Sequence, residues 1–205
     1  MQKTKKIFIT ATNTDIGKTY TTCALLKKYA QQGYRVGAMK PIETGVKTTP
    51  KDGEKLLNIS KKYNPLFKDL QPNEITPITL EQPAAPFVAN NLKEIELTPI
   101  FTTMHKLEKL CDILFIEGAG GLYVPIGRNF YMIDLIKQLE VDSTLLVTHC
   151  ELGCINDTML STKALETAQL EYEVIFNCKN GSENFQTTSK PFLELLYTHT
   201  DKTLL

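Results

Sequence analysis

The sequence predicts an α/β fold, in which a mainly parallel β-sheet is flanked by helices. Short apolar, β-rich runs alternate along the chain with longer segments of helical periodicity. The first of these runs leads directly into a glycine-containing turn and a helix. The 205 residues, 42% of them hydrophobic, are enough for a domain that buries roughly 70% of its unfolded surface. No repeat or linker divides the chain, so we expect residues 1–205 to form a single domain.

The expected strands and helices follow this alternation. Five apolar runs are candidate strands: Lys6–Thr10, Arg35–Met39, Ile113–Glu117, Ser143–Thr148 and Glu173–Phe176. Helical spacing predicts helices over Tyr20–Gln32, Leu97–Lys109, Met132–Leu139, Asn156–Ala168 and Lys190–Leu196. Residues 43–96 interrupt the alternation, because they contain six prolines and little periodicity. A segment of this length without regular structure is usually functional or mobile.

The composition limits the classes of partner. Lys+Arg and Asp+Glu both number 23, so nothing indicates a broad surface for nucleic acid or anionic membranes. No apolar run is long enough to span a membrane, and the apolar stretch 7–9 is too short for a signal peptide. We therefore expect a soluble, cytoplasmic protein.

The five cysteines are odd in number and mostly scattered, so we expect them to be reduced. His149, Cys150 and Cys154 form the one local cluster that could in principle share a metal ion. No second ligand pair accompanies them, which favours a structural role for all three.

Residues 7–20 are typical of a strand, a phosphate-binding turn and the start of a helix. The backbone N–H groups of such a turn converge at the helix N-terminus, where the helix dipole also favours anions. Gly17 leaves room for a phosphate, Lys18 can reach the β- and γ-phosphates, and the Thr19 hydroxyl can ligate Mg²⁺. We call residues 11–19 the phosphate loop, and it predicts a three-layer architecture like that of the P-loop NTPases. The alternative is an incidental Gly-Lys-Thr, because the usual motif has glycine where Thr12 stands.

Two further segments are expected at the same edge of the sheet, because ligands of open parallel sheets collect where the strands end. Glu117 ends one apolar run and can serve a metal ion, while the glycine-rich residues 118–121 can offer backbone amides to a substrate. Lys40 ends another run, where a buried ammonium group is costly unless an anion meets it. Each could be scaffold alone. Together with Lys18 and Thr19 they favour phosphoryl transfer from a Mg²⁺-bound triphosphate.

These motifs resemble those of the dethiobiotin synthetases of biotin biosynthesis. The resemblance spans residues 6–178 and is carried by Thr10–Thr19, Lys40-Pro41, Thr44-Gly45, Glu117–Gly121 and Leu152–Asn156. The family shares the extra residue between Ala11 and Gly17. The resemblance implies an ATP- and Mg²⁺-dependent cyclo-ligase that converts 7,8-diaminopelargonic acid and CO₂ to dethiobiotin. The implied reaction passes through a carbamate and a carbamic–phosphoric anhydride, and it releases ADP and phosphate.

The resemblance also implies roles for individual residues. Lys18 and Lys40 would be catalytic. The nucleotide would contact Asn13, Thr14, Asp15, Ile16, Gly17, Lys18, Thr19, Tyr20, Glu117 and Asn177. Mg²⁺ would bind Thr19, Glu117 and Asp52, with Glu54 as the rival to Asp52. The substrate would contact Thr14, Lys40, Thr44, Gly118, Ala119, Gly120, Gly121, Gly153, Cys154 and Asn156.

Two further expectations concern the subunit partner and the base. Family members are homodimers, so the turn Gly153–Asn156 is expected to reach the neighbouring subunit's active site and hold the substrate carboxylate. Asn177 matches the family's adenine-contacting asparagine. The proline-containing turn that closes over the base in the family has no counterpart before Leu205. We therefore expect an open base pocket that accepts other nucleoside triphosphates besides ATP.

Other classes of protein share parts of this pattern. A P-loop ATPase switch of the partitioning type would carry a signature lysine at the position of Asn13, and it often has a terminal amphipathic helix; neither is evident. A glutamine-dependent relative, such as the cobyrinic acid diamide synthetases, would need an additional domain that 205 residues are not expected to hold. A non-catalytic nucleotide-binding module would keep the phosphate loop but would not need Lys40 or Glu117.

Overall fold

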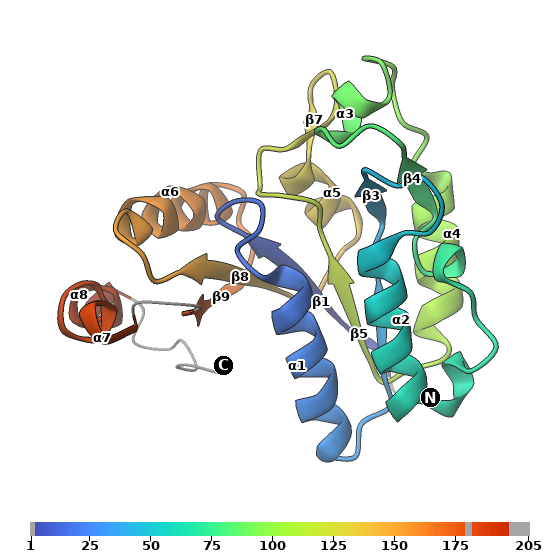
Figure 1. Ribbon diagram of the computed structural model, residues 1–205, viewed down its shortest axis with the longest axis horizontal. Helices are drawn as coiled ribbons and strands as arrows, with labels where there is room; N and C mark the ends of the chain where they lie inside the picture. The colour runs from blue at the N-terminus through green and yellow to red at the C-terminus, as the bar shows by residue number, and fades with distance from the viewer. Residues whose placement is uncertain (1–2, 179–181, 197–205) are drawn as a thin grey trace.

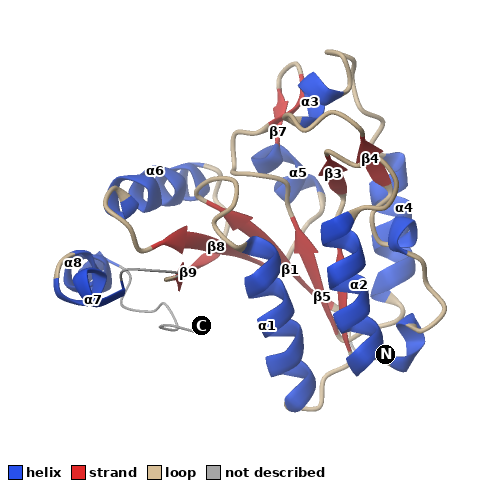
Figure 2. Ribbon diagram, viewed as in Figure 1, coloured by secondary structure: helices blue, strands red, loops and turns tan. Residues whose placement is uncertain are grey.

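The structure of the chain, a computed structural model, describes residues 3–178 and 182–196 (Figure 1). Its main sheet has five parallel strands in the order β2-β5-β1-β8-β9. These strands are β1 (Lys5–Ala11), β2 (Val36–Met39), β5 (Ile113–Glu117), β8 (Ser143–His149) and β9 (Tyr172–Asn177). Helices flank the sheet, so the predicted α/β, P-loop NTPase-like architecture is confirmed (Figure 2).

All five predicted strands are present, each within one residue of its expected bounds. Their near-continuous apolar character reflects burial on both faces of a parallel sheet. Phe8, Phe115 and Leu146, from three neighbouring strands, are fully buried in the core. Because β1 lies between β5 and β8, the phosphate loop that follows β1 emerges at the middle of the sheet edge.

Five of the helices were expected from the periodicity. They are α1 (Lys18–Gln31), α4 (Thr98–Glu108), α5 (Met132–Gln138), α6 (Cys154–Thr167) and α8 (Ser189–Leu196). Two short helices, α3 (Pro86–Ala89) and α7 (Ser182–Thr187), were not expected. Within the described residues, no helix combines the length and the apolar character that a membrane crossing requires.

The expectation that residues 43–96 lack regular structure is wrong, because they contain the long helix α2 (Lys51–Tyr63). The buried residues of α2 are Gly53, Leu56, Leu57 and Ser60, which have the spacing of one helical face. Because glycine and serine occupy two of these four positions, the apolar residues alone do not reveal the helical period of this segment. α2 packs against α1 and β2 and brings its N-terminus to the edge of the sheet that the phosphate loop occupies (Figure 1).

Shorter elements complete the same segment and its surroundings. β3 (Ile42–Thr44) follows soon after Lys40 and pairs in parallel with β4 (Ile78–Leu80). The antiparallel pair β6 (Pro125–Gly127) and β7 (Phe130–Tyr131) follows the glycine-rich turn. Two 3₁₀ helices, η1 (Pro65–Phe67) and η2 (Pro72–Glu74), connect α2 to β4.

Cys150 and Cys178 form a disulfide bond, so the expectation that all cysteines are reduced is wrong for this pair. β8 and β9 are parallel neighbours with His149 beside Asn177, and the two cysteines follow directly, with their Cα atoms 5.0 Å apart. Strand pairing creates this adjacency between residues 28 apart in sequence, which spacing alone does not reveal. Cys23, Cys111 and Cys154 are free thiols.

Candidate active site

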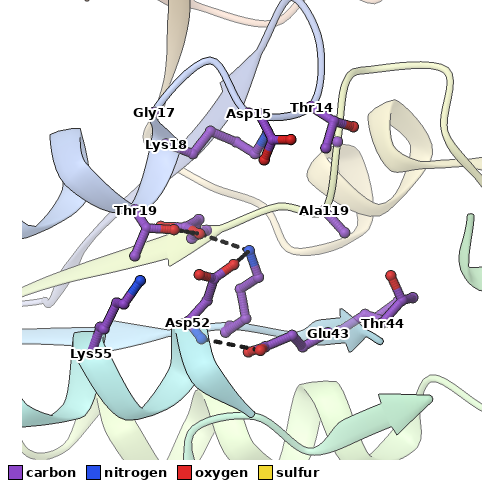
Figure 3. Close-up of a pocket in the computed structure, with 14 residues that line it drawn as sticks. Thr14, Asp15, Gly17, Lys18, Thr19, Glu43, Thr44, Asp52, Lys55 and Ala119 are labelled. Carbon is purple, nitrogen blue, oxygen red and sulfur yellow. Dashed lines mark hydrogen bonds and ion pairs between the residues drawn. The ribbon is translucent and has the colours of Figure 1, made fainter. Parts of the chain in front are cut away.

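A cavity of about 320 Å³ opens where β1, β2 and β5 end, and we call it the phosphate cavity (Figure 3). It is lined by Thr14, Asp15, Gly17, Lys18, Thr19, Lys40, Ile42, Glu43, Thr44, Asp52, Lys55, Glu117, Ala119 and Gly120. All but three of these were predicted as site residues from the sequence. The three that were missed are Ile42, Glu43 and Lys55.

The phosphate loop joins β1 to α1 by a tight turn. Gly17 has φ of 100°, in the left-handed region that favours glycine, and α1 begins at the next residue. No described side chain caps the start of α1, so its first N–H groups face the turn. The glycine-rich turn packs against this loop, since a Cβ atom at Gly121 would lie 3.2 Å from the carbonyl oxygen of Ala11. These features leave backbone donors available to an anion.

The Lys18 side chain folds back over the phosphate loop. Its Nζ atom donates a hydrogen bond to the carbonyl oxygen of Asn13 at 3.1 Å. Burial and, to a lesser extent, the neighbouring Lys40 ammonium group lower the pKa of Lys18 to about 8, although Glu117 and Asp52 act in the opposite direction. A bound phosphate group would supply the negative charge that favours the charged form of Lys18.

Lys40 lies buried at the centre of the cavity. Its Nζ atom donates to Glu117 Oε1 at 2.6 Å and to the carbonyl oxygen of Gly118 at 3.2 Å, and it lies 3.3 Å from Asp52 Oδ2. Burial lowers the pKa of Lys40, but Glu117 and Asp52 together raise it more, so the net shift is upward. Lys40 therefore stays a charged ammonium group. It faces Glu117 because β2 and β5 are paired, with Met39 beside Ile116.

Glu117 is fully buried and is held by α1 as well as by Lys40. The Thr19 hydroxyl donates to Glu117 Oε1 at 2.8 Å, and the Thr22 hydroxyl lies 2.9 Å from Oε2. Thr22 was not predicted as a site residue. The signal for it was available, because positions three apart share one face of a helix.

The arrangement fits a magnesium ion, which prefers oxygen ligands. Two carboxylates, Asp52 and Glu117, converge on the Lys40 ammonium group, which shows that they can share a cation. The Thr19 hydroxyl adjoins Glu117. Glu54 is exposed and does not line the cavity, which favours Asp52 over Glu54 as the third ligand.

A second cavity, of about 240 Å³, lies beside the ends of β8 and β9, and we call it the base cavity. It is lined by Asn13, Asp15, Ile16, His149, Cys150, Glu151, Asp157 and Asn177. The Asn177 Nδ2 atom donates to the carbonyl oxygen of Ile16 at 2.7 Å, so two of the predicted nucleotide residues meet here. Tyr20, another predicted nucleotide residue, is 63% exposed on α1 and lines neither cavity.

The predicted substrate residues fall into separate groups. Thr14, Lys40, Thr44, Ala119 and Gly120 line the phosphate cavity, and Gly118 adjoins it through its carbonyl oxygen. Gly121 lines a larger groove of about 720 Å³, in which Tyr123 and Leu160 are exposed.

The turn at the start of α6 lies outside the phosphate cavity. Gly153 precedes the helix with φ of 100°, and Asn156 donates to Asp157 at 3.2 Å. The Cys154 side chain is fully buried, whereas Leu152 is fully exposed. The structure therefore does not bring Gly153, Cys154 and Asn156 to the phosphate cavity of the same chain.

Comparison with known proteins finds sequence relatives along most of the chain. A family model described as an AAA domain matches residues 5–193. An ATP-dependent dethiobiotin synthetase of Sulfurovum sp. (strain NBC37-1) is 45% identical over 93% of this chain and 90% of its own length. The enzyme of that name from Wolinella succinogenes is 36% identical over 92% of this chain and 88% of its own length.

Solved structures resemble the chain in fold. The MinD cell division protein of Aquifex aeolicus has a TM-score of 0.53 and 17% identity, covering 94% of this chain and 78% of its own. A putative plasmid partition protein of Borrelia burgdorferi bound to AMPPNP has a TM-score of 0.55 and 14% identity, covering 98% and 86% respectively. At these identities the likeness concerns the fold alone.

Proposed function

The chain belongs to the family of ATP-dependent dethiobiotin synthetases, which are ligases, and from this premise we propose that it closes the cyclic urea of dethiobiotin. The substrates would be 7,8-diaminopelargonic acid, CO₂ and ATP. The observation that carries the proposal is the cluster of buried Lys40 and Glu117 with the partly exposed Asp52, beside the phosphate loop. A module that only bound nucleotide would not need this cluster, whose burial is costly.

The proposed reaction has three steps that balance. CO₂ adds to one amine of the substrate, which loses a proton and becomes a carbamate. A carbamate oxygen attacks the γ-phosphorus of ATP, which releases ADP and forms a carbamic–phosphoric anhydride. The second amine then attacks the carbonyl carbon, phosphate leaves, and the loss of a proton yields the cyclic urea.

Each step requires the protein to place charge and to exclude water. Lys18 would hold the transferred phosphoryl group from the side of the phosphate loop, and the N-terminal amides of α1 would bind the neighbouring phosphates. Lys40 would contact the carbamate and the γ-phosphate from the other side, because its ammonium group is buried beside Glu117 at the end of β5. Burial of Lys40 and Glu117 would also keep water from the reactive anhydride.

Thr19, Glu117 and Asp52 would hold the magnesium ion. When bound, this ion would neutralise part of the charge on the ATP phosphates. The Lys40 ammonium group that now contacts both carboxylates would turn towards the γ-phosphate and the carbamate. Its four-carbon side chain gives it the reach for this change.

We further propose that the protein is a homodimer in which the turn Gly153–Asn156 completes the partner's active site. The turn exposes Leu152 fully, and Tyr123 and Leu160 expose apolar surface around the large groove. Exposed apolar surface of this kind is typical of an interaction site. The amides at the start of α6 would suit the carboxylate of the substrate.

The direct test is to incubate the purified protein with 7,8-diaminopelargonic acid, bicarbonate, Mg²⁺ and ATP. We expect dethiobiotin, identified by mass spectrometry, together with one equivalent each of ADP and phosphate. Omission of the diamine should stop phosphate release. Phosphate release that does not depend on the diamine, with no dethiobiotin formed, would contradict the proposal and favour a nucleotide switch of the partitioning type.

A further inference from the structure

Glu43 is a buried carboxylate at the edge of the phosphate cavity that the proposed reaction does not use. It lies in β3, between Lys40 and Thr44 in sequence, and it is 7% exposed. A buried carboxylate is costly unless hydrogen bonds satisfy it. Its hydrogen bonds therefore indicate what it does.

Both oxygens of Glu43 accept hydrogen bonds from the first turn of α2. The Oε1 atom accepts from the Asp52 amide at 3.0 Å, and the Oε2 atom accepts from the Gly53 amide at 2.9 Å. The residue before α2 is Pro50, which offers no side-chain cap. Glu43, which lies in β3, therefore caps the N-terminus of α2. The helix dipole favours a negative charge at this end of a helix.

This cap fixes the residue whose side chain faces Lys40. Asp52 donates its backbone N–H to Glu43 while its carboxylate lies 3.3 Å from Lys40 Nζ (Figure 3). β3 is itself anchored, because it pairs with β4 and the Lys40 amide donates to the Ile75 carbonyl oxygen at 2.9 Å. Glu43 thus ties the start of α2 to the strand that carries Thr44, and it orients Asp52 into the cavity.

We propose that Glu43 is a positioning residue, which acts through Asp52 to set the affinity of the site for the divalent metal–nucleotide complex. This inference rests on the proposed function, because it takes Asp52 as a metal ligand. Glu43 would not be a metal ligand itself, since both of its oxygens are held by backbone amides of α2. The groups that hold Glu117 are side chains, which can turn away. Partners that orient metal ligands in this way typically change metal affinity about 10- to 100-fold when they are removed.

The test compares Glu43→Gln with Glu74→Gln. The Glu43→Gln side chain keeps its size, but its NH₂ group cannot accept from a backbone amide. Glu74 is a matched control, because its Oε2 atom caps η2 by accepting from the Gln71 amide at 2.8 Å and it does not line the phosphate cavity. Mn²⁺ binding with a non-hydrolysable ATP analogue is measured by the electron paramagnetic resonance signal of free Mn²⁺, so the readout does not depend on turnover.

We expect Glu43→Gln to weaken Mn²⁺ binding by about 10-fold. The Mg²⁺ concentration for half-maximal dethiobiotin formation should rise by the same factor, whereas kcat at saturating Mg²⁺ should change by less than about twofold. Glu74→Gln should leave the Mn²⁺ affinity unchanged. In an Asp52→Asn background, the effect of Glu43→Gln on Mn²⁺ binding should disappear, because Glu43 acts through Asp52. If Glu43→Gln does not fold, Glu43→Asp, shortened by one methylene, should show a smaller loss of the same kind.

An unchanged Mn²⁺ affinity in a folded Glu43 variant would overturn the inference, since Glu43 would then serve stability alone. Full additivity with Asp52→Asn would overturn it as well. Failure of the proposed function has a different signature: the wild-type protein would bind Mn²⁺ and the nucleotide analogue but form no dethiobiotin.

Discussion

The phosphate cavity and the turn at the start of α6 differ in how far a single chain completes them. In the cavity, Lys40 contacts Glu117 at 2.6 Å and Asp52 at 3.3 Å; Lys40 directly follows β2, Glu117 ends β5 and Asp52 lies in α2. In the turn, Leu152 is fully exposed, and Asn156 donates to its own neighbour in sequence. The comparison teaches that the groups proposed for phosphoryl transfer are assembled within one chain, whereas the proposed contact of the turn with the substrate carboxylate would need a second chain.

The largest expected effect comes from breaking the cavity. Lys18→Ala and Lys40→Ala should each lower turnover at least ~10²-fold, because each removes a charge that stabilises the transferred phosphoryl group. Steady-state dethiobiotin formation measures this. Lys106→Ala is the control, since Lys106 pairs with Glu74 away from the cavity and its loss should leave turnover near the wild-type value.

Near-normal turnover in either variant would remove that lysine from the mechanism. Lys40→Ala also leaves Glu117 buried without its cation, which can destabilise the fold. Thermal unfolding of both variants is therefore measured alongside, so that a lost fold is not taken for a lost catalytic group.

The next prediction tests whether the turn acts across a dimer. Asn156→Asp should weaken use of the substrate, because it sets a negative charge against the substrate carboxylate. When equal amounts of the Asn156→Asp and Lys40→Ala proteins are mixed and their subunits exchange, the mixture should regain about a quarter of wild-type activity. Half of the dimers would then contain one subunit of each kind, and each of these dimers would have one intact site of its two. Activity is compared before and after mixing. No gain on mixing would mean that the turn serves its own chain or no site.

The smallest expected effect lies in the base cavity, whose lining includes neither Lys18 nor Lys40. Asn177→Ala should raise KM for ATP by a factor of about 3 to 10 and leave kcat near the wild-type value, because it removes binding that the ground state and the transition state share. Initial rates over a range of ATP concentrations check this. A loss confined to kcat would place Asn177 in the chemical step instead.

The same cavity tests the expectation of a permissive base pocket. In the wild-type protein, GTP and CTP should support dethiobiotin formation within about 10-fold of ATP, since a pocket that makes few hydrogen bonds to the base discriminates weakly. A strong preference for ATP would contradict that expectation.

The sequence predicts the parts of the fold whose signals are local. The five strands of the main sheet are continuous apolar runs, and each lies within one residue of its expected bounds. α2 was missed, because Gly53 and Ser60 carry half of its buried face. The Cys150–Cys178 disulfide was missed for a different reason, since it depends on which strands pair.

The same division applies to the site. Lys18, Lys40 and Glu117 could be predicted because each lies at or directly after the end of a strand, or opens a helix, and parallel strands bring such positions to one edge. Glu43 could not be predicted in its role, because its partners are backbone amides of a helix that the periodicity does not show. Thr22 could have been predicted from its helical spacing alone, because it lies three residues after Thr19 on α1 and contacts the same carboxylate.

The strand order has a consequence for the nascent chain. β1 and β2 are made first, but they are not neighbours, because β5 lies between them in the finished sheet. Glu117, at the end of β5, contacts Lys40 and Thr19 across 77 and 98 residues of sequence. The phosphate loop and Lys40 therefore leave the ribosome well before the strand that joins them, and contacts this distant in sequence form late in folding. A chain that stopped before residue 113 would carry both lysines but have no cluster in which to use them.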